Sequence, residues 1–239
     1  MNVGAYGIRS DYQPNPVNQS FDEVSGEEFW TPDRIATSAR HQRAVYRLAR
    51  RLAQDLGTRR VIDVGCGLAT KLMAFFDSEY DLIGLDQESA VEMCRQMHDR
   101  GTFIGVNLLD TSDIASLRQT ADLVICSDVI EHVEDPDVLL ALLRNLARGD
   151  ARVVISTPER VALHGPDVVS PTNPVHIREW SRDELATYLT SSGFDVQSHS
   201  VLFPFSPKVD PMTVRYVLDR VRRRRPWRTT QVAVCRLAS

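Results

Sequence analysis

The chain has 239 residues, a length that suits one large domain with a full hydrophobic core. Its formal net charge of −4 excludes the overall basic character of proteins whose main partner is nucleic acid. The four cysteines show no C-x-x-C spacing, which argues against a zinc site and favours buried, reduced thiols. The chain shows neither a signal-sequence pattern nor an apolar run of membrane-spanning length, so we expect a soluble cytoplasmic protein without membrane insertion.

The first 32 residues are polar and contain several turn-forming Pro and Asn residues. We therefore predict an irregular N-terminal arm over 1–32 and the main domain over 33–239. The arm either closes over an acceptor as a lid or packs on the domain. Its aromatic residues are Tyr6, Tyr12, Phe21, Phe29 and Trp30.

A first helix is predicted over 33–56. Thr31 and Pro32 are typical of a helix start, apolar residues recur at helical spacing, and Gly57 is typical of a helix end. Short β-branched apolar runs, typical of strands buried on both faces, then alternate with helical segments. The predicted strands are 60–64, 81–85, 103–106, 122–127 and 151–156, and the helices between them are 69–76, 88–99, 112–118 and 136–147.

The pattern changes after Pro158. Residues 158–180 have the composition of a long loop, and Ser181 with Glu184 forms a capping box that opens a helix ending at Gly193. Strands near 194–203 and 230–237 complete the sheet, the last of them antiparallel. The sequence therefore predicts an α/β fold, a doubly wound Rossmann-like sheet of seven mostly parallel strands with helices on both faces.

The most informative segment follows the first predicted strand. Gly65 and Gly67 allow a tight turn close to a ligand, and Asp86 near the end of the next strand is placed to accept hydrogen bonds from ribose hydroxyls. A dinucleotide-binding turn would have a third glycine where this chain has Thr70, and Asp63 would repel a pyrophosphate. A carboxylate at that position suits the amine of S-adenosylmethionine (SAM).

These segments resemble the class I SAM-dependent methyltransferases across residues 35–237. The matching segments are 61–67, 83–86, 106–108, 127–133 and 154–158. The resemblance implies SAM as cofactor, S-adenosylhomocysteine as product, and cofactor contacts at the ends of the first four strands. The cofactor-binding residues so implied are Asp63, Gly65, Cys66, Gly67, Asp86, Gln87, Asn107, Leu108 and Ser127. Asn107 stands where the family usually has aspartate. Lys71 is either a partner for the SAM carboxylate or a surface lysine.

The loop over 158–180 is similar to that of methyltransferases encoded beside glycosyltransferase and polysaccharide genes. The similarity rests on 156–160, 165–166, Asn173 and 176–180. It suggests the hydroxyl of a sugar or glycoconjugate as acceptor, with 158–180 as the acceptor-site loop. Arg178 would then bind an anionic group and Trp180 would stack on a sugar. The alternative is a buried tryptophan and an Arg–Glu pair that stabilises the loop.

Methyl transfer to a hydroxyl requires a base, and His132 and His176 are the candidates. Asp128, Glu131 and His132 share one face of a helical turn after the fourth strand. Together with His176 they are similar to the metal site of methyltransferases that act on ribose 2′-hydroxyls or quinol precursors. We predict Asp128, His132 and His176 as catalytic residues without a bound metal. A divalent metal ion bound by these residues is the less favoured alternative. A third alternative is that the residues after the fourth strand only cap the helix and pack against their neighbours.

Residues 220–228 contain six arginines. A phosphorylated sugar, a lipid-linked acceptor at a membrane face and RNA are possible partners, but the acidic remainder of the chain favours a solvated connector. We therefore expect a small-molecule or glycoconjugate acceptor, do not favour nucleic acid, and leave a peripheral membrane contact open. The remaining alternatives are an RNA methyltransferase, a natural-product or quinol O-methyltransferase with or without metal, and a SAM-binding partner protein without turnover.

Overall fold

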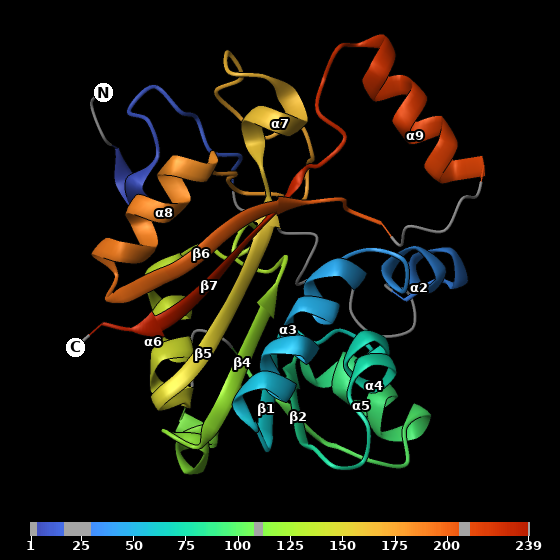
Figure 1. Ribbon diagram of the computed structural model, residues 1–239, viewed down its shortest axis with the longest axis vertical. Helices are drawn as coiled ribbons and strands as arrows, with labels where there is room; N and C mark the ends of the chain where they lie inside the picture. Colours follow the sequence, from blue (N-terminus) through green and yellow to red (C-terminus); the bar gives the residue numbers. More distant parts are fainter. Residues whose placement is uncertain (1–3, 17–29, 108–111, 206–210, 239) are drawn as a thin grey trace.

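A computed structural model of the chain describes residues 4–16, 30–107, 112–205 and 211–238. Its centre is a sheet of seven strands in the order β3-β2-β1-β4-β5-β7-β6 (Figure 1). The strands are β1 (Arg60–Val64), β2 (Asp81–Asp86), β3 (Thr102–Gly105), β4 (Ala121–Ser127), β5 (Ala147–Pro158), β6 (Phe194–Leu202) and β7 (Thr230–Leu237).

All pairings among β1 to β5 are parallel, whereas β7 lies antiparallel between β5 and β6. This arrangement confirms the predicted fold class, including the antiparallel last strand. The chain adds β2 and β3 on one side of β1 and then returns to add β4 on the other side. In sheets of this type ligands bind where the strand order reverses, outside the carboxyl ends of the strands. The carboxyl ends of β1 and β4 are therefore where a site is expected.

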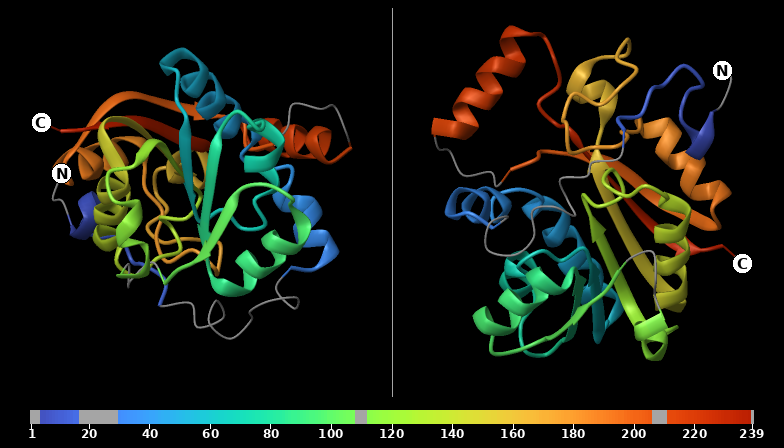
Figure 2. Two further views of the ribbon diagram at one scale, coloured as in Figure 1. Left: turned by 90° about the horizontal axis from the view of Figure 1, so that it is seen from below. Right: turned by 180° about the vertical axis from the view of Figure 1, so that it is seen from behind.

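Helices cover both faces of the sheet, because successive strand side chains point to opposite sides. On β4, Leu123 and Ile125 pack into one core cluster, and Val124 and Cys126 pack into the other. The first cluster lies under α3 (Arg43–Leu56), α4 (Thr70–Phe75) and α5 (Glu88–Met97), and the second lies under η3 (Ser112–Leu117), α6 (Pro136–Leu146) and α8 (Arg182–Ser191) (Figure 2). The buried, apolar strands predicted from the sequence are confirmed.

The helix predicted over 33–56 is two helices, α2 (Pro32–Ser38) and α3. Gln42 adopts a left-handed conformation with φ of 58°, and its amide donates to the carbonyl of Pro204 at 3.0 Å. His41 forms a β-bridge with Phe205, and their rings lie 4.6 Å apart. These contacts with a segment distant in sequence override the helical periodicity. The predicted ends hold, because Thr31 caps α2 and Gly57 ends α3 in a left-handed conformation.

Three elements of the structure were not predicted from the sequence, and the first is a short 3₁₀ helix, η1 (Ala5–Gly7), in the N-terminal arm. A short helix, α7 (Arg160–His164), opens the long loop after β5. A further helix, α9 (Pro211–Arg222), projects from the body of the protein between β6 and β7 (Figure 1). None of the helices within the described ranges has both the length and the apolar character needed to cross a membrane.

Candidate active site at the carboxyl edge of the sheet

The turn between β1 and α4 depends on its glycines. Gly65 and Gly67 have φ of 74° and 55°, a region in which a side chain is strained. A Cβ atom on Gly65 would overlap Cγ2 of Val129, which belongs to the segment after β4. The glycine turn therefore packs directly against the post-β4 segment, and the ends of the two central strands form one site.

Asp86, at the end of β2, holds the glycine turn from the other side. Its Oδ2 accepts from the amide of Gly67 at 2.7 Å, and its Oδ1 accepts from the amide of Gln87 at 2.8 Å. Burial raises the pKa of Asp86, while these two amides oppose that rise. Each carboxylate oxygen can accept more than one hydrogen bond, so the geometry leaves room for hydroxyl donors from a ligand.

Asp63, the residue before the last of β1, is completely buried. Its Oδ2 accepts from the hydroxyl of Tyr46 on α3 at 2.8 Å, whereas its Oδ1 has no hydrogen-bond partner among the described residues. Burial raises the pKa of Asp63 to about 7, with Tyr46 and Lys71 opposing the rise. A buried carboxylate oxygen without a donor costs stability, and a ligand that brings a donor would remove that cost.

The end of α2 and Trp30, two residues before the helix, lie close to residues of the glycine turn and of α4. A Cβ atom on Gly67 would stand 3.0 Å from a ring carbon of Trp30. Lys71 is buried, and its Nζ lies 3.3 Å from the carbonyl oxygen of Ser38 at the end of α2. Lys71 is therefore not a surface lysine; burial lowers its pKa and its contact with α2 links that helix to the site.

The other predicted cofactor residues lie at the same edge. Cys66 is buried within the glycine turn, and Asn107 is exposed just beyond β3. The hydroxyl of Ser127, at the end of β4, lies 2.8 Å from the hydroxyl of Ser156. Leu108 lies outside the described residues. Contacts between these residues and a cofactor stay predictions.

The backbone is strained at Asp128, directly after β4. Asp128 has a φ of 54°, which is uncommon for a residue with a side chain. Its amide donates to the carbonyl of Ser156, and its Oδ1 accepts from the hydroxyl of Ser156 at 2.7 Å. Such conformations persist where neighbouring contacts enforce them, and they are frequent at functional sites.

Glu131 and His132 follow in a short turn that is not helical, contrary to the helical turn predicted after the fourth strand, because α6 begins only at Pro136. Glu131 is buried; its Oε2 accepts from the hydroxyl of Thr157 at 2.9 Å, and its Oε1 has no hydrogen-bond partner among the described residues. Burial raises the pKa of Glu131 well above its usual range. Nδ1 of His132 lies 2.8 Å from the carbonyl oxygen of Val175, which can only accept, so Nδ1 carries the proton. Burial, followed by the influence of His176, lowers the pKa of His132 to about 4.

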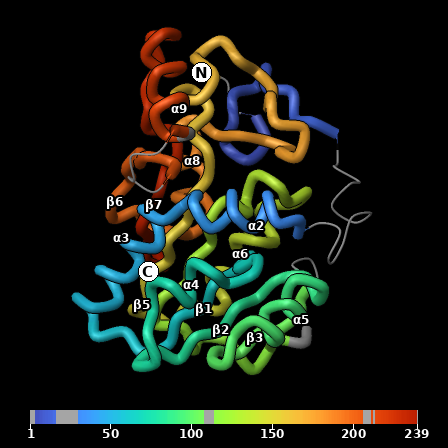
Figure 3. The backbone as a smooth tube through the Cα atoms, turned by 90° about the vertical axis from the view of Figure 1, so that its right-hand side faces the viewer, coloured from blue at the N-terminus to red at the C-terminus, as the bar shows by residue number. Residues whose placement is uncertain are grey.

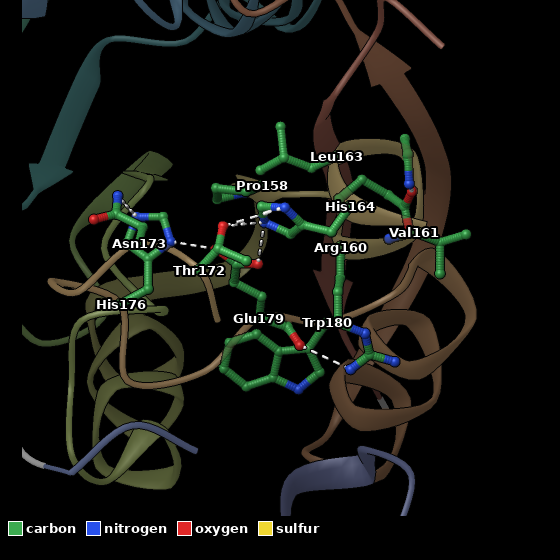
Figure 4. A network of polar contacts seen from close by, with 12 residues as sticks. Pro158, Arg160, Val161, Leu163, His164, Thr172, Asn173, His176, Glu179 and Trp180 are labelled. Carbon is green, nitrogen blue, oxygen red and sulfur yellow. Dashed lines mark hydrogen bonds and ion pairs between the residues drawn. The ribbon is translucent and has the colours of Figure 1, made fainter. Parts of the chain in front are cut away.

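His176 and His164 both contact the buried carboxylate of Glu179 (Figure 4). Nδ1 of His176 lies 2.6 Å from Oε1, and Nε2 of His164 lies 3.0 Å from Oε2. Burial alone would raise the pKa of Glu179, but the contacts with the two histidines lower it to about 2. Nε2 of His176 accepts from the side-chain amide of Asn173 at 2.9 Å. Both nitrogens of His176 are therefore used inside the loop, and its ring stands edge-on to that of His132 with centroids 4.9 Å apart.

Arg178 and Trp180, the predicted acceptor-binding residues, are both buried. Arg178 donates to the carbonyls of Val133 and Glu134 at 2.8 and 2.9 Å, not to the carboxylate of Glu179 as the structural alternative expected. The ring of Trp180 is fully covered, and its indole NH donates to the carbonyl of Tyr6 at 2.9 Å. This arrangement favours a structural role for both side chains, and acceptor contact stays a prediction.

The described part of the N-terminal arm is fixed to the loop over 158–180 (Figure 3). Tyr12 accepts from the amide of Glu179 at 2.8 Å through its hydroxyl. Asn15 donates through its backbone amide to Ile177 at 2.9 Å and through its side-chain amide to the carbonyl of His176 at 2.9 Å. The arm therefore supports the loop that carries His176. Phe21 and Phe29 lie outside the described residues.

Sequence reasoning did not find Tyr46, His164 or the bridging role of Glu179. Tyr46 lies on α3, away from its partner Asp63 on β1, whereas His164 and Glu179 belong to the same irregular loop as His176, where no regular element predicts which side chains meet. The three ligand-type residues that the structure does bring together are Glu131, His132 and His176, whose potential ligand atoms lie within 4.8 Å of one another. Asp128, predicted as a fourth member, instead bonds to Ser156.

The chain is similar in sequence to known proteins. The sequence model of a family described as "Methyltransferase domain" matches residues 37–199. A probable S-adenosylmethionine-dependent methyltransferase of Mycobacterium tuberculosis is 30% identical over 179 residues, which cover 74% of this chain and 62% of that relative. The chain thus spans less than two thirds of the length of that curated relative. A ubiquinone biosynthesis O-methyltransferase of Hahella chejuensis is 25% identical over 182 residues, which cover 69% of this chain and 76% of the relative.

Two solved structures have a similar fold. A SAM dependent methyltransferase from Aquifex aeolicus matches with a TM-score of 0.57 and 14% identity over 87% of this chain and 100% of that chain. The second match is to a structure of the Haloferax volcanii Trm112 methyltransferase activator in complex with a putative methyltransferase. Its TM-score is 0.60, with 16% identity over 76% of this chain and 83% of the matched chain. At these identities the likeness concerns the fold alone.

Proposed function

The chain belongs to the class I SAM-dependent methyltransferases, and on that premise we propose that it transfers the methyl group of SAM to a hydroxyl oxygen, with His132 as general base. The observation that carries the proposal is the contact of 2.8 Å between Nδ1 of His132 and the carbonyl oxygen of Val175, from which we infer that Nδ1 carries the proton and Nε2 is the basic nitrogen. Transfer to oxygen requires removal of the hydroxyl proton, and an oriented imidazole is suited to that step.

The residues at the edge of the sheet fit SAM. When bound, SAM supplies an activated methyl group on a sulfonium. Asp63 has a buried oxygen that lacks a donor, and the amine of the methionine moiety would provide one. The carboxylate of Asp86 is held by two backbone amides and suits the ribose hydroxyls. Gly67 brings the backbone close without a Cβ atom, and the ring of Trp30, which lies against it, would cover a cofactor bound there.

His132 is suited to act as a base because it is held and neutral. The carbonyl of Val175 fixes its ring and tautomer. A pKa of about 4 keeps the imidazole unprotonated at neutral pH, and it also makes the ring a weaker base than an ordinary imidazole. His176 then positions the loop beside His132, because both of its nitrogens are bonded within the loop.

The acceptor class that we propose is the hydroxyl of a sugar or glycoconjugate. Its support is the similarity of the loop over 158–180 to methyltransferases associated with glycan genes, together with the formal net charge of −4, which disfavours RNA as the acceptor. A SAM-binding partner protein without turnover is the alternative outside the enzyme class, and it predicts that replacing His132 changes nothing measurable.

His132→Asn tests the base directly, because an asparagine amide can keep the hydrogen bond to Val175 but cannot accept a proton. Incorporation of labelled methyl from SAM into an extract of the native host should fall about 10²- to 10⁴-fold, with SAM affinity retained. His199→Ala, which removes a half-buried histidine on β6, is the matched control and should stay active. Unchanged incorporation by His132→Asn would contradict the proposal.

A second candidate is metal-assisted methylation of a small aromatic hydroxyl such as a quinol. It is favoured by the convergence of Glu131, His132 and His176, and by relatives named ubiquinone biosynthesis O-methyltransferases. A divalent ion held there would lower the pKa of a hydroxyl bound to it. His176 would have to release Asn173 to become a ligand, and for this reason we place the metal second. Loss of incorporation on addition of a chelator, restored by Mg²⁺ or Zn²⁺, would favour the metal.

A further inference from the structure

The helix α9 carries an exposed apolar stripe. Val214, Leu218 and Val221 recur at helical spacing, so they lie on one side of the helix, and they are 43%, 49% and 58% exposed. Trp227, shortly after the helix, is 53% exposed. Large apolar side chains that are grouped and exposed indicate an interaction surface, whereas scattered ones do not.

The opposite side of α9 is already used. The ring of Tyr216 packs edge-on against Phe203 and Phe205, with centroids 5.7 and 5.0 Å apart. The guanidinium of Arg220 is buried and donates to the carbonyls of Leu163 and Pro226 at 2.8 and 2.7 Å. The prediction that residues 220–228 form a solvated connector is therefore wrong for Arg220, which is buried. These contacts fix the helix on the body of the protein and turn the apolar stripe outward.

Arginines flank the stripe. Arg215 and Arg222 line the same side of the helix as Leu218, next to a shallow hollow of about 450 Å³. Asp219, the acidic residue of the helix, is paired with Arg223 at 3.0 Å. Residues 211–228 contain seven arginines and one aspartate, a net charge of +6 in a chain whose total is −4. The segment is therefore strongly basic within an acidic chain, as are residues 40–60, which also contain seven arginines and one aspartate.

We propose that α9 and the arginines after it dock on an anionic lipid bilayer, with the stripe of Val214, Leu218 and Val221 entering the headgroup region. A helix with a basic side and an adjacent apolar stripe lies in the interface of a membrane, where aliphatic side chains are buried and arginines contact lipid phosphates. RNA would use the arginines but would leave three aligned aliphatic side chains exposed to water. The apolar stripe is thus what distinguishes the two partners.

The position of α9 makes this docking relevant to the site. Leu202, the last residue of β6, and Pro158, the last of β5, both pair with Thr230 at the start of β7. The segment that contains α9 therefore leaves and re-enters the sheet at the edge that carries the glycine turn and His132. Provided that the proposed methyl transfer holds, docking would place this edge beside the membrane, where a lipid-anchored acceptor resides.

Vesicle binding tests the docking without any turnover, so its failure is distinct from failure of the proposed function. The full chain is sedimented with phosphatidylcholine vesicles that do or do not contain phosphatidylglycerol. We expect binding only with the anionic lipid. Arg222→Gln should weaken binding to the anionic vesicles about fivefold, because one basic residue near an anionic surface contributes about that factor in affinity. Leu218→Ser should weaken it about tenfold, because the leucine is half-exposed before docking.

The matched controls lie on α3, away from α9. Leu56 is 47% exposed, close to the value for Leu218, and Arg51 is an exposed arginine. Leu56→Ser and Arg51→Gln should bind as the unaltered chain does. Absence of binding to anionic vesicles would overturn the proposal, and so would equal losses in the α3 and α9 variants. Binding of a single-stranded RNA oligonucleotide that depends on Arg222 but not on Leu218 would assign the surface to nucleic acid and overturn it as well.

Discussion

Replacing Asp63 by asparagine should change how stability depends on pH. Burial raises the pKa of Asp63 to about 7, whereas an unfolded aspartate titrates near 3.9. Between these two values the folded chain holds a proton that the unfolded chain has lost, so stability decreases as pH rises. Integration of this difference from pH 5 to pH 8 gives a loss of about 2–3 kcal/mol in the free energy of unfolding. Asparagine cannot titrate, so that part of the loss should disappear.

The assay is urea unfolding of the unliganded chain and of Asp63→Asn at several pH values between 5 and 8. Other groups titrate in the same range, and the difference between the two chains isolates Asp63. The hydroxyl of Tyr46 can still donate to the asparagine oxygen, so the variant should fold. Two parallel curves would show that the carboxylate at this position is not destabilised by burial, and the argument that a ligand amine completes the site would lose its basis.

Three further changes test other parts of the site. Asp86→Ala should weaken SAM binding at least a hundredfold in calorimetry, because the carboxylate that would accept from the ribose hydroxyls is removed, and undiminished affinity would place the cofactor elsewhere. Glu179→Gln should lower the free energy of unfolding at pH 7 by about 3 kcal/mol, because it removes the charge between His164 and His176. The pKa of Glu179 is lowered to about 2 in the folded chain. The unaltered chain should therefore lose this stabilisation only as pH falls from about 4.5 towards 2. Trp30→Ala should speed the release of SAM in stopped-flow fluorescence, because the ring lies against the turn at Gly67, and an unchanged release rate would exclude a covering role.

Much of the fold could be predicted from local patterns. The strands and most helices were found because each carries its own periodicity and its own cap, as Ser181 with Glu184 does for α8. The break at Gln42 could not be found in this way, because it results from contacts with Pro204 and Phe205. The helix α9 was missed because the arginine run drew the interpretation towards a solvated connector, although apolar residues recur at helical spacing within 211–222.

The candidate site divides in the same manner. Gly65, Gly67 and Asp86 stand at fixed distances from predicted strands, so their proximity followed from the topology of a parallel sheet. For the loop over 158–180 no predicted strand or helix fixed which residues would meet. Sequence spacing could not show that Glu179 would lie between two histidines, or that Trp180 would be covered by the N-terminal arm. Long-range packing of irregular segments decides those contacts.

The most direct test of methyl transfer to a hydroxyl is to identify the bond that labelled methyl enters. The chain is incubated with SAM carrying a labelled methyl group and an extract of the native host, and the product is fractionated and treated with mild alkali, which cleaves methyl esters but not methyl ethers. The account predicts alkali-stable label in a glycan or glycolipid fraction, lost with Asp86→Ala and with His132→Asn. Label released as methanol, label in RNA, or no label in any fraction would contradict it.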